Sequence, residues 1–63
     1  MKKLVKERKN RDMTQTDLAF ELRIHPSQLS KIENGRMIPF KPTTKKLEEF
    51  FNMEIDNLLQ DLD

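Results

Sequence analysis

Apolar residues recur every three or four positions along most of the chain, a spacing typical of helices with one buried face. The pattern is clearest at the centre, where Leu18, Ala19 and Leu22 fall on one side of a helix. Thr14 and Asp17 have the spacing of a capping box, in which each side chain accepts a hydrogen bond from the other residue's backbone N–H. A short helix is therefore expected after Thr14.

A second short helix is expected from Pro26 to Asn34. Proline suits the first position of a helix, because its φ is preset and its missing N–H is not needed there. Leu29 and Ile32 supply the inward stripe, and Gly35 can adopt the left-handed backbone that ends many helices. The two helices are so close in sequence that a sharp turn must join them.

Three further helices flank this central pair. Residues 2–11 predict a basic helix, another helix opens at Pro42, and a last one covers roughly residues 55–61. The expected fold is all-α, with five helices in one small domain that spans residues 1–63. Because so short a chain has few large apolar side chains, we expect those of its second half to lie in the core. The inward candidates on the flanking helices are Leu4, Val5, Arg8, Leu47, Phe50, Phe51, Ile55, Leu58 and Leu59, and the stretch before Pro42 adds Met37, Ile38 and Phe40.

Composition excludes several kinds of site. The chain has no cysteine and one histidine, so neither a disulfide nor a metal site is expected. No apolar run approaches the roughly 18 residues of a membrane span and no signal-peptide core is seen, so we expect a cytoplasmic protein without a membrane partner. The serines have no evident general base, and a single glycine cannot form a glycine-rich phosphate loop, so neither enzyme activity nor a cofactor is expected.

Charge is unevenly distributed, although the formal net charge is only +1. Residues 1–11 hold six Lys or Arg side chains and one Glu, whereas residues 53–63 hold four Asp or Glu and no Lys or Arg. Such a molecule can turn a basic face toward phosphates and its acidic end away from them. The alternative is that both ends carry ordinary solubilising charge.

The outward side of the helix at residues 26–34 is rich in hydrogen-bonding groups. A hydroxyl, an ammonium and two amides are the groups that read base edges in a DNA major groove. Glu33 falls instead beside the inward stripe, where an ionised carboxylate is costly unless it is paired. The outward residues are Ser27, Lys31 and Asn34, with Gln28 and Ser30 on the flanks.

Three segments carry a family resemblance, namely TQTDLA, PSQLSKIENGR and FFNMEIDNLL. In this order and spacing they resemble the lambda-repressor-like helix-turn-helix domains of the Xre/Cro type, over almost the whole chain. The resemblance implies a compact five-helix domain that binds double-stranded DNA sequence-specifically, with residues 26–34 in the major groove. It also implies a small transcriptional regulator, in the simplest mechanism a repressor that occludes a promoter.

The resemblance further implies roles for individual residues. Arg8 and Glu33 occupy positions that form a buried ion pair, while Asp12 and Arg23 stand where the family usually has glycine in left-handed turns. The implied base contacts are Pro26, Ser27, Gln28 and Lys31, with Lys31 suited to guanine and Gln28 to adenine. The implied phosphate contacts are Thr14, Gln15, Thr16, His25, Ser30, Asn34 and Arg36. For His25, a helix cap is the alternative.

One such domain reads only about four or five base pairs, so a homodimer on a palindromic operator is expected. The candidate dimer contacts are Met37, Ile38, Met53 and Ile55, and the alternative is that most of them close the core. A rival function on the same fold is a protein-interaction module, such as an antitoxin or an anti-repressor. Phe20, which is expected on the exposed side of its helix, would serve a protein partner.

Overall fold

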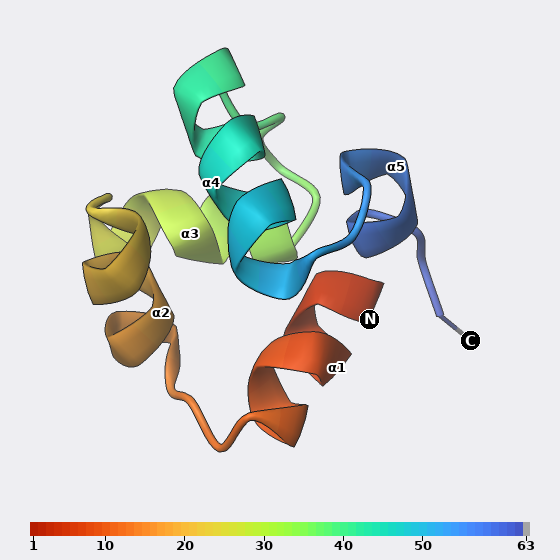
Figure 1. Cartoon of the computed structure of the whole chain (residues 1–63), viewed down its shortest axis with the longest axis horizontal. Coiled ribbons are helices and arrows are strands. Elements are labelled where there is room, and N and C mark those ends of the chain that lie inside the picture. Colours follow the sequence, from red (N-terminus) through yellow and green to blue (C-terminus); the bar gives the residue numbers. More distant parts are fainter. Residues whose placement is uncertain (63) are drawn as a thin grey trace.

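The computed structural model describes residues 1–62. Its helices follow in the order α1 (Lys3–Asn10), α2 (Gln15–Leu22), α3 (Pro26–Glu33), α4 (Lys41–Phe51) and α5 (Ile55–Leu58). Figure 1 shows α2 and α3 as neighbours, with α1 and α5 toward the chain ends and α4 between these two pairs. The described part of the chain confirms the expected all-α fold of five helices.

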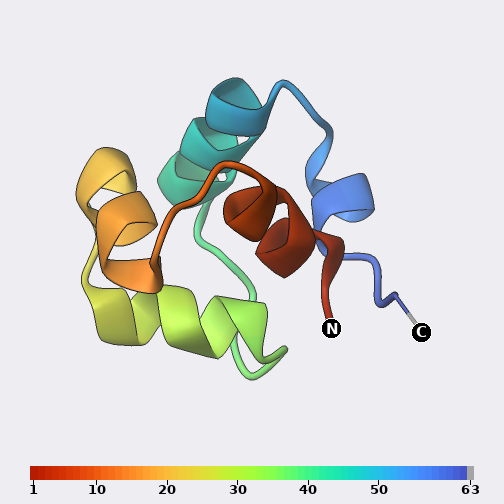
Figure 2. The same ribbon diagram turned by 90° about the horizontal axis from the view of Figure 1, so that it is seen from below.

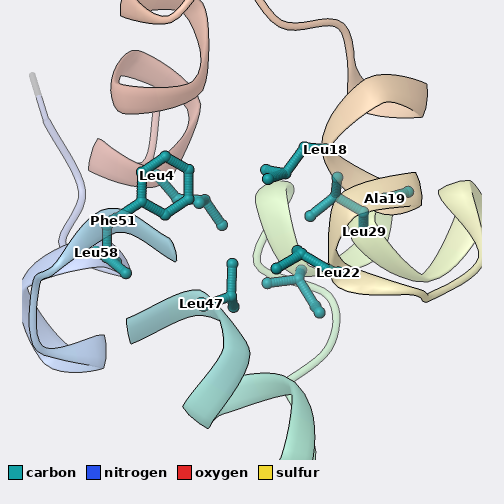
Figure 3. Close-up of a cluster of buried hydrophobic side chains, with 9 residues drawn as sticks. Leu4, Leu18, Ala19, Leu22, Leu29, Leu47, Phe51 and Leu58 are labelled. Atoms are coloured by element: carbon teal, nitrogen blue, oxygen red, sulfur yellow. The ribbon is translucent and has the colours of Figure 1, made fainter. Parts of the chain in front are cut away.

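Nine buried apolar side chains form the core, and every helix contributes at least one. In Figure 3, Leu47 of α4 lies between a group from α1, α4 and α5 and a second group from α2 and α3. Because the helices are short, each buries its stripe against several neighbours rather than one partner. The core residues are Leu4, Leu18, Ala19, Leu22, Leu29, Ile32, Leu47, Phe51 and Leu58. Val5, Phe50, Ile55 and Leu59, which were also expected inward, are only half-buried.

Helices α1 to α4 are each followed by a residue with positive φ. These residues are Asp12 (φ 55°), Arg23 (φ 56°), Gly35 (φ 74°) and Asn52 (φ 54°). In each case the next residue donates its N–H to a carbonyl five positions back, and this bond closes the last turn of the helix. The left-handed turns expected at Asp12 and Arg23 are therefore present, although only glycine adopts this backbone without steric cost.

The last helix is shorter than expected, because it ends at Leu58 rather than near residue 61. The chain beyond it pairs with the other end of the protein. The Lys3 N–H donates to the Gln60 carbonyl (2.9 Å), and the Leu62 N–H donates to the Met1 carbonyl (2.7 Å). Backbone groups that a longer helix would have used internally are thus engaged across the two ends of the chain.

Folding brings the basic and the acidic end of the chain together at one pair of charged side chains. The first and last described residues lie close together (Figure 2), and Lys2 forms a salt bridge with Asp61 at 3.1 Å. Arg11 pairs with Glu7 at 3.0 Å, and its guanidinium also lies 4.7 Å from the centre of the Phe51 ring. Three of the six cations of residues 1–11, namely Lys2, Arg8 and Arg11, form salt bridges, and of these three the Lys2–Asp61 pair joins the two ends of the chain.

The segment between α3 and α4 departs from the expected core in a regular way. Met37 is half-buried and Pro39 is buried, whereas Ile38 is 83% exposed and Phe40 is 65% exposed. Non-helical, extended backbone sends successive side chains to opposite sides. The alternation therefore buries positions 37 and 39, and the expectation that Ile38 and Phe40 lie in the core is wrong.

One carboxylate of α4, that of Glu48, lies against the start of α5. It is half-buried, and its Oε2 accepts the Ile55 N–H at 2.9 Å. That N–H is one of the free donors at the start of α5. Glu48 therefore joins α4 to α5, while the neighbouring Glu49 is exposed.

Candidate nucleic-acid interface

The start of α2 is fixed by the capping box that the sequence predicts. The Asp17 N–H donates to the Thr14 hydroxyl at 3.0 Å, and the Thr14 N–H donates to Asp17 Oδ2 at 2.9 Å. The backbone N–H of Thr14 is the main cause that lowers the pKa of the Asp17 carboxyl from its ordinary value, with the Thr14 side chain second. The first turn of α2 is thereby set in place and carries an ionised carboxylate at neutral pH.

The turn from α2 to α3 is held at two points. The Ile24 N–H donates to the Ala19 carbonyl at 3.0 Å across the left-handed Arg23, and the Ile24 side chain packs against the core. Lys46 Nζ of α4 donates to the Leu22 carbonyl at 3.1 Å. These contacts satisfy carbonyls that the end of α2 leaves free, and they fix the direction in which α3 begins.

Both ends of α3 are capped. His25 Nδ1 accepts the Ser27 N–H at 3.1 Å, and Pro26 takes the first helical position. At the other end the Arg36 N–H donates to the Lys31 carbonyl at 2.8 Å across the left-handed Gly35. The cap expected as the alternative role of His25 is therefore present. It leaves the ring proton on Nε2, so a phosphate contact from that nitrogen stays compatible with the cap.

The side of α3 that faces away from the core forms a polar surface, here called the α3 surface. Leu29, Ile32 and Glu33 are buried on the opposite side of the helix. In Figure 2, α3 runs along the edge of the molecule opposite α4, so no other helix covers this side. The α3 surface consists of Ser27, Lys31 and Asn34, which are exposed, and Gln28 and Ser30, which are half-buried. Pro26 is half-buried at its N-terminal end.

A buried ion pair supports α3 from below. Arg8 Nε and Nη2 donate to the two carboxylate oxygens of Glu33 at 2.8 and 3.2 Å. Arg8 Nη1 also donates to the Met13 carbonyl at 2.8 Å, and Gln15 Nε2 donates to Glu33 Oε1 at 2.8 Å. The pair implied by the family resemblance is thus present. It links α1, the start of α2 and the C-terminal part of α3 in one network.

The Gln15–Glu33 bond also places the start of α2 against the C-terminal part of α3. The exposed side chains of Thr14 and Thr16 therefore lie toward the same end of α3 as Asn34 and Arg36, which are exposed as well. His25 is exposed at the opposite end. The residues expected to contact phosphate thus flank the α3 surface at both ends. Gln15 is half-buried, and one of its amide hydrogens is engaged by Glu33.

The candidate dimer residues divide into two groups. Met37, Met53 and Ile55 are half-buried and pack against the core, in line with the alternative for these three. Ile38 is exposed, and sequence reasoning missed that Phe40 is exposed beside it. The alternation of an extended segment around Pro39 could have shown that Ile38 and Phe40 share one side, but which side is buried depends on the folded core.

No helix within residues 1–62 is long and apolar enough to cross a membrane. No three His, Asp or Glu side chains of this range gather as a metal site.

Comparison with known proteins identifies the fold family. The sequence model of the family described as "Helix-turn-helix" matches residues 4–58. No curated protein and no solved structure matches the chain significantly. The matched range includes α2, the Arg23 turn and α3, together with most or all of the other helices. The chain therefore belongs to the lambda-repressor-like helix-turn-helix family and is a DNA-binding helix-turn-helix domain.

Proposed function

We propose that this protein binds double-stranded DNA sequence-specifically, with α3 in the major groove, and acts in the cytoplasm as a small non-catalytic transcriptional repressor. The observation that carries this proposal is the α3 surface. The helix is capped at both ends. One side packs against the core, and the other side presents hydroxyl, amide and ammonium groups. Occlusion of a promoter needs nothing beyond such binding.

The dimensions of α3 support major-groove binding. A helix with its side chains is about 10–12 Å in diameter, which fits the roughly 12 Å width of the major groove of B-DNA. In this proposal Lys31 donates to guanine O6 and N7, and the Gln28 amide pairs with adenine N6 and N7. Pro26 can offer only apolar contact, for example to a thymine methyl group. Phosphate contacts at the two ends of α3 would fix the register of these side chains on the duplex.

We further propose that two copies bind a palindromic operator with half-sites about 34 Å apart. Ile38 supports this proposal most directly among the four candidate contacts, because a side chain that is 83% exposed is available to a second copy. Phe40 adds an aromatic group on the same side of the extended segment. Met37, Met53 and Ile55 would contribute through their exposed parts.

The test is selection of bound sequences from a randomised duplex library, followed by fluorescence anisotropy on the enriched duplex at about 50 and 200 mM salt. We expect an enriched motif with two-fold symmetry and binding that weakens steeply with salt. Lys31→Ala should lower affinity for this duplex by about 1–3 kcal/mol and relax the motif at one position. Arg36→Ala should weaken all duplexes alike and reduce the salt slope by about one unit.

Lys45→Ala is the matched control, since Lys45 is exposed on α4, and α4 lies on the side of the molecule opposite α3 in Figure 2. It should leave both the motif and the affinity for the enriched duplex nearly unchanged. Absence of binding to any duplex at the lower salt concentration would refute the DNA-binding function.

A second candidate function is favoured by Phe20. Its side chain is 79% exposed on α2, and it lines a shallow, mainly apolar groove with Met13, Thr16, Asp17 and Glu21. Such a groove suits a protein partner, as in an antitoxin or an anti-repressor. A protein-only binder would be insensitive to Lys31→Ala and would lose its partner on Phe20→Ala. A DNA regulator would lose DNA affinity on Lys31→Ala and keep it on Phe20→Ala.

A further inference from the structure

His25 and Ser27 are connected by two contacts at the start of α3. The Ser27 N–H donates to His25 Nδ1 at 3.1 Å. The Ser27 hydroxyl oxygen lies 2.7 Å from the same nitrogen. Both residues are exposed, so the Ser27 hydroxyl remains open to a ligand on its other sides.

The first contact determines the direction of the second. A backbone N–H can only donate, so Nδ1 must carry its lone pair and the neutral ring must hold its proton on Nε2. A nitrogen without a hydrogen cannot donate to the hydroxyl oxygen. The contact at 2.7 Å is therefore a hydrogen bond in which the Ser27 O–H donates to His25 Nδ1.

This hydrogen bond leaves the Ser27 hydroxyl with acceptor capacity only. A serine hydroxyl has one hydrogen to donate and two lone pairs that accept, and His25 engages the hydrogen. An unconstrained serine pairs with donors and acceptors alike and so discriminates little between bases. A serine whose hydrogen is engaged favours a ligand that donates.

From this geometry we infer that His25 makes Ser27 a reader of exocyclic amino groups in the major groove. Adenine N6 and cytosine N4 donate there, whereas guanine O6 and thymine O4 only accept. Opposite Ser27 the protein selects adenine or cytosine, and an approaching guanine O6 or thymine O4 meets a lone pair instead of a hydrogen. The inference rests on the proposed function. His25 is a positioning residue that acts through Ser27.

The tautomer is tested without DNA. Two-bond proton–nitrogen NMR correlations of the histidine ring, at a pH where the ring is neutral, should show Nδ1 unprotonated and Nε2 protonated. His25 is the only histidine of the chain, so the assignment is direct. A ring protonated on Nδ1 would overturn the inference whatever the protein binds.

The base preference is tested with the library selection on three variants. Ser27→Ala locates the base pair that Ser27 reads, as the position where the preference is lost. At this position the unmodified protein should favour adenine or cytosine over guanine and thymine by about three- to tenfold, the range expected for one hydrogen bond. His25→Gly removes the acceptor but keeps a residue that is tolerated at the helix cap.

His25→Gly should remove the preference at this position alone and leave the position read by Lys31 unchanged. In the Ser27→Ala background it should have no further effect on the motif. A loss of helix stability would instead weaken the base preference at every position of the motif. The selection therefore distinguishes loss of the His25–Ser27 hydrogen bond from loss of helix stability. Preference for guanine or thymine, no position that responds to Ser27→Ala, or an unaltered preference in His25→Gly would each overturn the inference while the DNA-binding function stands. Failure to select any motif would overturn the proposed function and the inference together.

Discussion

Replacement of Arg8 by methionine tests how far stability depends on the ion pair beneath α3. Arg8 supplies two hydrogen bonds to Glu33, whose side chain is only 2% exposed. Methionine has a similar length and keeps much of the packing, but it removes every donor. The Glu33 carboxylate would then remain buried with the Gln15 amide as its hydrogen-bond donor.

The expected loss is large for a protein of this size. Removal of one partner from a buried pair costs about 3–5 kcal/mol, because the other charge stays desolvated. A chain of 63 residues has about 3–9 kcal/mol of unfolding free energy, at roughly 0.05–0.15 kcal/mol per residue. Arg8→Met should therefore remove about one third of the stability or more, and at the lower end of the stability range it should leave most of the protein unfolded.

Urea unfolding followed by far-ultraviolet circular dichroism measures this change. Arg11→Met is the control. Its partly exposed ion pair with Glu7 should be worth no more than about 1 kcal/mol, and its contact with the Phe51 ring adds about 0.5–1 kcal/mol, so its total loss should stay below that of Arg8→Met. The double variant Arg8→Met/Glu33→Met should recover most of the lost stability, since no charge is left buried. If Arg8→Met is no less stable than Arg11→Met, or if the double variant is as unstable as the single one, the stranded carboxylate is not the cause.

Three further predictions concern the helices themselves. Arg23→Gly should raise the unfolding free energy by about 0.5–1 kcal/mol in the same urea assay, because glycine adopts φ 56° without strain. Gly35→Ala should lower it by about 1–2 kcal/mol, because alanine is strained at φ 74°. The Asp17 carboxylate has a lowered pKa, so its stabilising effect is present above the unfolded value of 3.8 and is lost as the pH falls through the folded value. The stability difference between the wild type and Asp17→Asn should therefore shrink on acidification, and a difference that persists in acid would contradict this assignment. Leu47→Ala should cost about 2–5 kcal/mol through a cavity between the two halves of the core, and a loss below about 1 kcal/mol would show that the core closes around it.

Much of the candidate site follows from residues that are close in sequence. The capping box of α2 depends on Thr14 and Asp17, and the start of α3 depends on Pro26, all within one helical turn. The apolar spacing also determines which side of α3 is buried, and thus which residues form the α3 surface. The family resemblance added the Arg8–Glu33 pair, which joins residues too distant in sequence for local rules to relate.

Of the two contacts of His25, one was predicted from neighbouring residues and the other was not. Its position before Pro26 indicated a helix cap, and the structure has that cap. The contact between its Nδ1 and the Ser27 hydroxyl is equally local, but it depends on the rotamers of both side chains. The sequence alone therefore could not show that the Ser27 hydroxyl is left to a ligand as a hydrogen-bond acceptor.

By itself the sequence determined the helical fold, the positions of the caps, and the polar residues that α3 presents to solvent. These features depend on hydrogen bonds and side-chain periods that span a few residues, so a single chain segment contains the information. Only the tertiary structure decided where α5 ends, how the charges of the two chain ends are paired, and whether Ile38 and Phe40 are buried. The end of α5 and the charge pairing depend on partners that folding brings from a distant part of the chain, such as Asp61 beside Lys2. The burial of Ile38 and Phe40 depends on whether the folded core leaves room for one more side chain.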